Sequence, residues 1–187
     1  MFQAMQLEVV HQLSRAPAVA HLMRSAWAWP IAESLHFVGL SLLVGSVVLF
    51  DLRLLGLGRA IPIAAMHRLI PFGLAGFVLN LVTGLAFLLT DATQYIYNPS
   101  FLWKMAFVAA AGANALTFYL TVGPRTIAPG APPGAPRPAR LIAAISLALW
   151  MGVVIAGRLL TFYRPFECAE GEREAATIVL CEPAGSP

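Results

Sequence analysis

Four long apolar runs determine what this chain can fold into. They cover residues 29–54, 69–90, 101–122 and 141–162, and each reaches the roughly 20 residues that an α-helix needs to cross a bilayer. Only 11% of the 187 residues are charged, whereas a soluble domain is about one quarter charged. We therefore expect an all-α integral membrane protein, in which residues 1–187 form one domain built on an antiparallel up-down bundle of four transmembrane helices.

The segments before and between these runs have sequence patterns that predict their local structure. Residues 1–28 lack the continuous apolar core of a signal peptide, and apolar side chains recur there at helical spacing, which predicts an amphipathic N-terminal segment on the membrane surface. The stretch 123–138 is rich in proline and glycine and predicts a non-helical tether. Asn98-Pro99 predicts an N-cap and a first-turn proline at the start of the third helix.

The arginines between the apolar runs are unevenly distributed. Six of them lie around the first and third loops, and none in the second: Arg53, Arg59, Arg68, Arg125, Arg137 and Arg140. Because Lys and Arg are retained on the cytoplasmic side, this pattern predicts a multi-pass bacterial inner-membrane protein with both termini in the periplasm. The periplasmic tail, residues 164–187, contains Cys168 and Cys181, and an oxidising compartment favours a disulfide between them. The net charge of +3 is accounted for by topology and anionic lipid, so no nucleic-acid partner is predicted.

Helical periodicity assigns faces to the first two runs. Small residues at 32, 39 and 46 line one side of the first helix, and a small and polar stripe from 73 to 91 lines the second, so both faces suit a neighbouring helix rather than lipid. Val47 and Asp51 share another stripe of the first helix. We expect Asp51 to pair with Arg53 or Arg59 at the cytoplasmic end. A buried amide needs a partner, so we expect Asn80 and Asn114 to bond each other.

Ionisable residues gather at one depth near the predicted outer surface. Counting about 1.5 Å per residue places five of them in a layer within about 10 Å of that boundary: Glu33, His36, Asp91, Lys104 and Arg158. Ionisable groups are rare inside membranes, and such a layer indicates a site for a cofactor, quinone, ion or proton. The alternative is structural, in which the charges neutralise one another and hold the helices together.

Three ligand classes suit this layer. Haem b held by two transmembrane histidines would need a second histidine at the depth of His36, but His67 lies about 30 Å away. His36 would then ligate alone or with an outer-side partner, drawn from His21, His11, Met23 and Met105. Copper or zinc could use His36 with Glu33 and His21. A quinone headgroup would use a histidine and an acid near the interface.

The sequence therefore predicts an integral inner-membrane protein whose periplasmic-side polar pocket binds a redox cofactor or a metal ion. Its role would be electron or ion transfer with a periplasmic or membrane protein partner. The alternative is a non-catalytic structural or assembly subunit of a larger membrane complex. No nucleophile elbow, phosphate loop or zinc-protease motif occurs in the sequence, so catalysis is not predicted.

Three stretches of the chain resemble a family of small bacterial four-helix inner-membrane proteins, a domain of unknown function. They are AESLHFVGLSLLVGSVVLFDLRLLGL, TGLAFLLTDATQYIYNPSFLWKM and WMGVVIAGRLLTFYRP, and the resemblance covers residues 29–165. It implies the four-helix fold and its topology, and it implies no activity or ligand. In fold type alone, the predicted bundle is also similar to copper-resistance membrane proteins and b561-type cytochromes.

Overall fold

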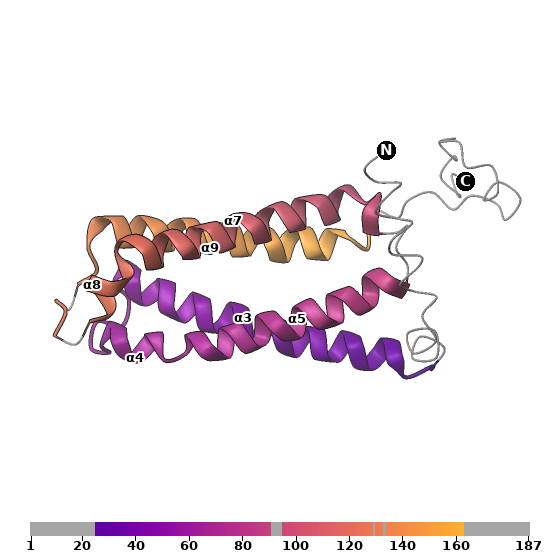
Figure 1. The fold of residues 1–187 in the computed structure, drawn as a ribbon, viewed down its shortest axis with the longest axis horizontal. Coiled ribbons are helices and arrows are strands. Elements are labelled where there is room, and N and C mark those ends of the chain that lie inside the picture. Colours follow the sequence, from indigo (N-terminus) through magenta and orange to yellow (C-terminus); the bar gives the residue numbers. More distant parts are fainter. Residues whose placement is uncertain (1–24, 91–94, 129, 133, 163–187) are drawn as a thin grey trace, which may run out of the picture.

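The computed structural model describes residues 25–90, 95–128, 130–132 and 134–162. All the helices in this part of the chain are α-helices (Figure 1): α3 Ala28–Leu55, α4 Ile63–His67, α5 Ile70–Thr90, α7 Pro99–Thr121, α8 Gly123–Ile127 and α9 Arg137–Leu159. The predicted amphipathic segment 1–28 lies almost wholly outside the described residues. The tail with Cys168 and Cys181 lies outside them as well.

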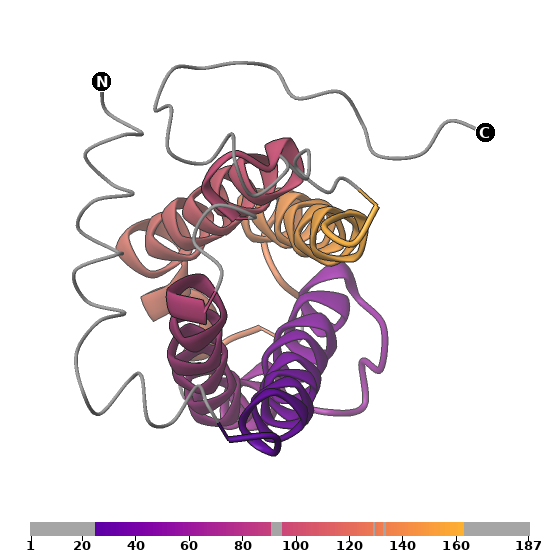
Figure 2. The ribbon, with the colours of Figure 1, turned by 90° about the vertical axis from the view of Figure 1, so that its right-hand side faces the viewer.

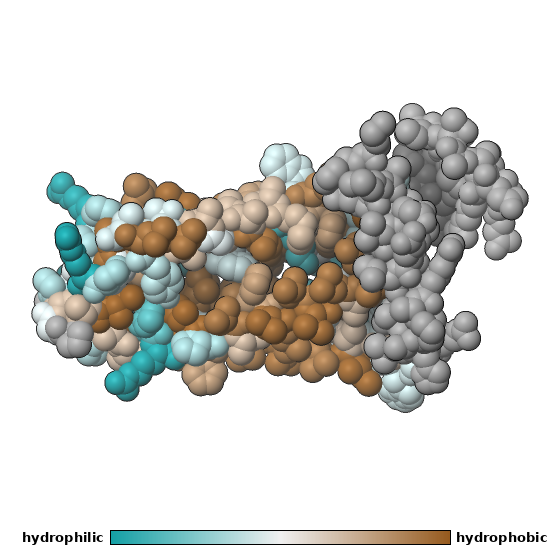
Figure 3. All heavy atoms as spheres, in the orientation of Figure 1, coloured by the Kyte–Doolittle hydropathy of each residue, from teal (hydrophilic) through white to brown (hydrophobic). Residues whose placement is uncertain are grey.

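Four spans are long and apolar enough to cross a membrane: α3, the segment Ile63–Thr90, α7 and α9. Their outer surfaces carry large apolar side chains, which appear in brown over much of the bundle in Figure 3. A surface of this kind belongs in contact with lipid, because exposing it to water would be unfavourable. The prediction of an all-α chain with four helices that are long and apolar enough to cross a membrane is confirmed, while the antiparallel up-down topology stays a prediction. The inner-membrane location and the periplasmic termini stay predictions of the charge pattern.

The start of α7 agrees with the sequence prediction, whereas the proline-rich stretch that follows α7 does not. Asn98 caps α7, and its side chain accepts a hydrogen bond from the backbone N–H of Ser100 at 2.9 Å, as the sequence predicts. The prediction of a non-helical tether over 123–138 is wrong at both ends of this stretch. Its first residues form α8, and α9 begins at Arg137. Both helices have a proline in the first turn. Proline suits a first turn because its fixed φ is already helical and no N–H is needed there.

The bundle consists of two helix pairs. α3 packs against α5, and α7 packs against α9. The pairs meet along α3 and α9, and again where α4 contacts α8 at one end of the bundle, whereas α5 and α7 make little or no contact (Figure 2). We call the end that contains α4 and α8 the α4–α8 end, and the other the opposite end. A large cavity opens on the side between α5 and α7.

Small residues bring α3 and α5 together. A Cβ atom added to Gly76 would lie 2.5 Å from the carbonyl oxygen of Gly39 and 2.7 Å from the backbone nitrogen of Leu43. At Gly73, an added Cβ would lie 3.2 Å from the Cβ of Ser46. The two backbones therefore approach so closely that only glycine fits at Gly76. This confirms the helix-facing side predicted for both runs.

The predicted hydrogen bond between Asn80 and Asn114 is wrong. The Asn80 Nδ2 donates to the carbonyl oxygen of Gly76 at 2.9 Å, within its own helix. The Asn114 Nδ2 donates to the carbonyl oxygen of Ile142 at 3.1 Å, across the α7–α9 contact. Each amide thus finds a backbone acceptor in its own helix pair, and neither needs the other.

Candidate functional site

His36 lies in the predicted polar layer, toward the opposite end of the bundle. It is half-buried, and its Nδ1 is 2.7 Å from the Thr83 Oγ1 on α5. The Thr83 hydroxyl itself donates to the carbonyl oxygen of Leu79 at 2.8 Å. When the Thr83 hydrogen is used in this bond, Nδ1 is the donor to Thr83, and Nε2 carries the lone pair. An imidazole in this tautomer can accept a hydrogen bond or ligate a metal through Nε2.

Lys104 is the second predicted residue that reaches this layer. It lies on α7, close enough to His36 for the two groups to interact electrostatically. Its aliphatic stem runs past Gly157 of α9, where an added Cβ would be 3.9 Å from the Lys104 Cδ and Cε. The structure therefore brings together two of the five predicted residues, His36 and Lys104, from different helix pairs.

The other three predicted residues are placed differently. Glu33 and Arg158 are exposed, and the Arg158 guanidinium lies 5.9 Å from the centre of the Phe162 ring. Neither these two nor Lys104 makes an ion pair with a described residue. Asp91 lies outside the described residues, as do three of the four candidate partners of His36, namely His11, His21 and Met23, whereas Met105 is exposed on α7.

The space near this layer is small. A cavity of about 50 Å³ lies beside it, lined in part by Trp29 and Phe87, and has room for one or two water molecules. Within the described part of the chain, no group of three or more His, Cys, Asp or Glu side chains could hold a metal ion. The predicted set of His36, Glu33 and His21 extends beyond that part.

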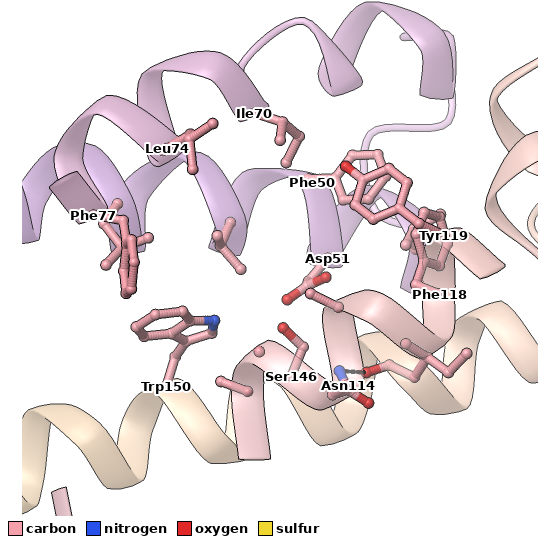
Figure 4. Close-up of a pocket in the computed structure, with 18 of the residues that line it drawn as sticks. Phe50, Asp51, Ile70, Leu74, Phe77, Asn114, Phe118, Tyr119, Ser146 and Trp150 are labelled. Carbon is pink, nitrogen blue, oxygen red and sulfur yellow. Dashed lines mark hydrogen bonds between the residues drawn. The ribbon is translucent and has the colours of Figure 1, made fainter. Parts of the chain in front are cut away.

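A much larger cavity lies between the two helix pairs, nearer the α4–α8 end (Figure 4). Its volume is about 320 Å³, and α3, α5, α7 and α9 all contribute to its walls. Most of the lining is apolar, from Leu43 and Val47 on α3 to Ile142 on α9. We call this space the Asp51 cavity.

The Asp51 cavity opens toward the side of the bundle. Leu74 on α5 and Gly112 on α7 both line it and are both exposed at the surface. Because α5 and α7 make little or no contact, no helix of the described residues closes this side. Figure 3 shows the opening as a recess between the two pairs. In a membrane, the mouth of the cavity would face the lipid.

Asp51 is the acidic group of this cavity. It is only 5% exposed, its Oδ2 has no hydrogen-bond partner, and Ser146 of α9 is the hydrogen-bonding neighbour of the carboxylate. Figure 4 shows both side chains pointing into the space between the helix pairs. Asn114 and Tyr119 add further polar atoms to the lining. The walls are thus apolar with a few polar groups, which is typical of a ligand site.

The predicted pairing of Asp51 with Arg53 or Arg59 is wrong. The Arg53 Nε donates to the carbonyl oxygen of Ile61, and the Arg59 Nε donates to that of Gly56 at 3.2 Å. Residues two apart on a helix point about 200° apart. Asp51 therefore faces the bundle interior, while Arg53 faces the chain that leads into α4.

Tyr119, which lines the cavity, contacts His67 at the α4–α8 end of the bundle. The His67 Nε2 lies 3.0 Å from the Tyr119 hydroxyl, and the Phe50 ring packs against His67 with ring centres 5.7 Å apart. This polar contact joins the segment Ile63–Thr90 to α7. No sequence signal pointed to this contact, because nothing in the sequence pairs His67 with Tyr119.

Comparison with protein-family models, curated proteins and solved structures finds no match to this chain. The resemblance to the four-helix family stays a prediction. Function is therefore inferred from the geometry of the cavity and of the polar layer.

Proposed function

We propose that this protein is a multi-pass membrane protein that binds a small lipophilic molecule in the Asp51 cavity. The observation that supports this most directly is the cavity itself. At about 320 Å³, it falls within the range of about 300 to 1,000 Å³ that is typical of small-molecule sites. A ligand of this kind would place its apolar body against the walls and a polar group beside Asp51.

The open side between α5 and α7 supports entry from the bilayer. A lipophilic molecule is concentrated in the membrane, and the mouth at Leu74 and Gly112 would face the lipid there. Such a ligand would not have to cross the loops at either end. Quinones, which the sequence predicts as one ligand class, belong to this group of molecules. The proposed site, however, lies in the other half of the bundle from His36.

Replacing Gly112 by phenylalanine should abolish binding of bromobenzene in the Asp51 cavity. Gly112 lines the cavity, and an added Cβ would meet nothing within 4 Å, so a large ring can occupy the mouth without a clash. Trp150 lines the cavity, and it becomes the sole reporter when Trp27, Trp29 and Trp103 are replaced by phenylalanine. In this background, bromobenzene should quench Trp150 fluorescence saturably, and Gly112→Phe should remove the saturable component.

Gly45→Phe is the matched control. An added Cβ at Gly45 also meets nothing within 4 Å, but Gly45 is exposed on α3 and does not line the cavity. Its quenching curve should match that of the parent protein. Equal, non-saturable quenching in all three proteins would contradict the proposed function.

The polar layer at His36 is a second candidate site. The observation that favours it is the 2.7 Å contact between the His36 Nδ1 and the Thr83 Oγ1, which leaves Nε2 as the ring nitrogen available to a ligand. The proposed ligand there is a redox cofactor such as haem b, or a metal such as copper. His36 would be its ligand, with Lys104 beside it. The alternative is that the protein serves as a structural or assembly subunit of a membrane complex.

For this second site, His36→Ala should remove a Soret band or stoichiometric copper from the purified protein. The imidazole would be the ligand, and its loss removes the donor atom. Optical spectra and metal analysis provide the measurement. His67→Ala, which changes a histidine at the α4–α8 end, should retain the signal. A wild-type protein that is colourless and free of metal would contradict the second site, and co-purification with other subunits would favour the structural role.

A further inference from the structure

We infer that the ligand of the Asp51 cavity is a lipophilic cation, an ammonium group on an apolar body, with the Asp51 carboxylate as its counter-charge. This inference rests on the proposed function, since it names the chemical class of ligand for the same cavity. Three features of the lining carry it: an unpaired buried acid, the lack of any basic side chain among the lining residues, and a set of aromatic walls.

The acid is the first feature. Asp51 is 5% exposed and its Oδ2 has no hydrogen-bond partner. Ser146 supplies one neutral hydroxyl, which offsets only part of the cost of removing a carboxylate from water. A ligand that brings a positive charge to Oδ2 would recover that cost.

The charge balance of the cavity is the second feature. Among the described residues that line it, none is Lys, Arg or His, and Tyr119 is the only other ionisable side chain. The neighbouring Arg53 is turned away and donates to the carbonyl oxygen of Ile61. Lys104, which lies toward the opposite end, does not line the cavity. The protein therefore brings an acidic group to the cavity lining without a matching basic one.

The aromatic walls are the third feature. Five rings from all four long helices line the cavity: Phe50, Phe77, Phe118, Tyr119 and Trp150. Figure 4 shows Phe77 and Trp150 on one side of Asp51, and the other three rings on the other side. Aromatic ring faces attract cations, and this attraction strengthens where water is excluded. An ammonium group at Asp51 would thus lie among rings, with its apolar body against the aliphatic walls.

A neutral ligand is the competing possibility, because a protonated Asp51 could donate a hydrogen bond to a carbonyl group. Two probes of nearly identical shape separate the two cases. Benzyltrimethylammonium carries a positive nitrogen where neopentylbenzene has a quaternary carbon. Their affinities can be measured in lipid nanodiscs by relief of bromobenzene quenching of Trp150, in the protein that retains no other tryptophan.

We expect mutation of the cavity to weaken binding of the charged probe more than binding of the neutral one. Asp51→Asn keeps the size of the side chain and should weaken benzyltrimethylammonium binding by about 30-fold or more, since it removes one partner of a buried charge pair. Binding of neopentylbenzene should change less than about threefold. Phe77→Leu leaves the carboxylate in place and should weaken binding of the cation several-fold more than that of the neutral probe. It therefore tests the inference even if Asp51→Asn folds poorly.

Glu33→Gln is the matched control, because it removes an exposed carboxylate that does not line the cavity. It should leave both affinities unchanged. Equal affinities of the wild-type protein for the two probes, unaffected by Asp51→Asn, would overturn the cation inference and leave the proposed function intact. Absence of saturable binding by either probe and by bromobenzene would overturn both.

Discussion

Replacing Gly76 by valine should prevent α3 and α5 from packing as they do. The Cβ alone would lie 2.5 Å from the Gly39 carbonyl oxygen and 2.7 Å from the Leu43 nitrogen. Both are backbone atoms, so no side chain can rotate away to make room, and the helices must separate. Overpacking of a core costs about 1 to 3 kcal/mol and sometimes more, and here we expect about 3 kcal/mol or more. Thermal unfolding in detergent, followed by circular dichroism, measures the loss.

Gly45→Val is the control for this substitution. It makes the same chemical change on α3 at a position where an added Cβ meets nothing within 4 Å. Its unfolding temperature should stay close to that of the wild-type protein. If Gly76→Val proved as stable as Gly45→Val, the close α3–α5 contact would be wrong.

Replacing Asn98 by alanine should give the second large loss of stability. Asn98 is fully buried, accepts from the Ser100 N–H at 2.9 Å and donates through Nδ2 to the Leu160 carbonyl oxygen at 3.2 Å. It therefore caps α7 and joins its start to the end of α9. Loss of an N-cap costs about 1 kcal/mol, and the partly buried Leu160 carbonyl left without its donor costs about 1 to 3 kcal/mol more.

The unfolding free energy of Asn98→Ala should accordingly fall by about 2 to 4 kcal/mol. Asn98→Ser keeps a capping acceptor for the Ser100 N–H and removes the donor to Leu160, so it should lose less unfolding free energy than Asn98→Ala. Thr117→Ala serves as the control, because the Thr117 hydroxyl is exposed and bonds only within its own helix, to the Ala113 carbonyl oxygen at 2.8 Å. A loss for Asn98→Ala no larger than that for Thr117→Ala would contradict the role given to Asn98.

The four membrane spans could be predicted from the sequence because length and hydropathy are properties of single segments. The small-residue face of α3 was predictable for the same reason, since Gly39 and Ser46 recur at helical spacing. The hydrogen-bond partners of Asn80 and Asn114 could not be predicted, because they depend on how each helix is rotated about its axis. The structure shows that each amide faces a carbonyl in its own helix pair.

The polar layer illustrates the same limit. Counting residues gives the depth of a side chain, and it placed His36 and Lys104 at one level. It does not give the direction in which a side chain points. Glu33 has a suitable depth and is nevertheless exposed, and Arg158 lies over Phe162 at the surface.

Asp51 was missed as a site residue although a signal was present. Helical periodicity places it on the same stripe as Val47, and both line the cavity. Its position near Arg53 made a loop-side ion pair the simpler prediction, but the two side chains point about 200° apart. The cavity itself could not be predicted, because it arises from the spacing of α5 and α7 rather than from any one segment.

The most direct test of ligand binding between the helix pairs is anomalous X-ray diffraction from crystals grown with bromobenzene. Bromine scatters anomalously, so its position can be located without reference to a model. We predict a bromine peak inside the Asp51 cavity, between Gly112 and Trp150, that is lost in Gly112→Phe. Bromine peaks only on the lipid-facing surface, with none in the cavity of the wild-type protein, would contradict the proposed function.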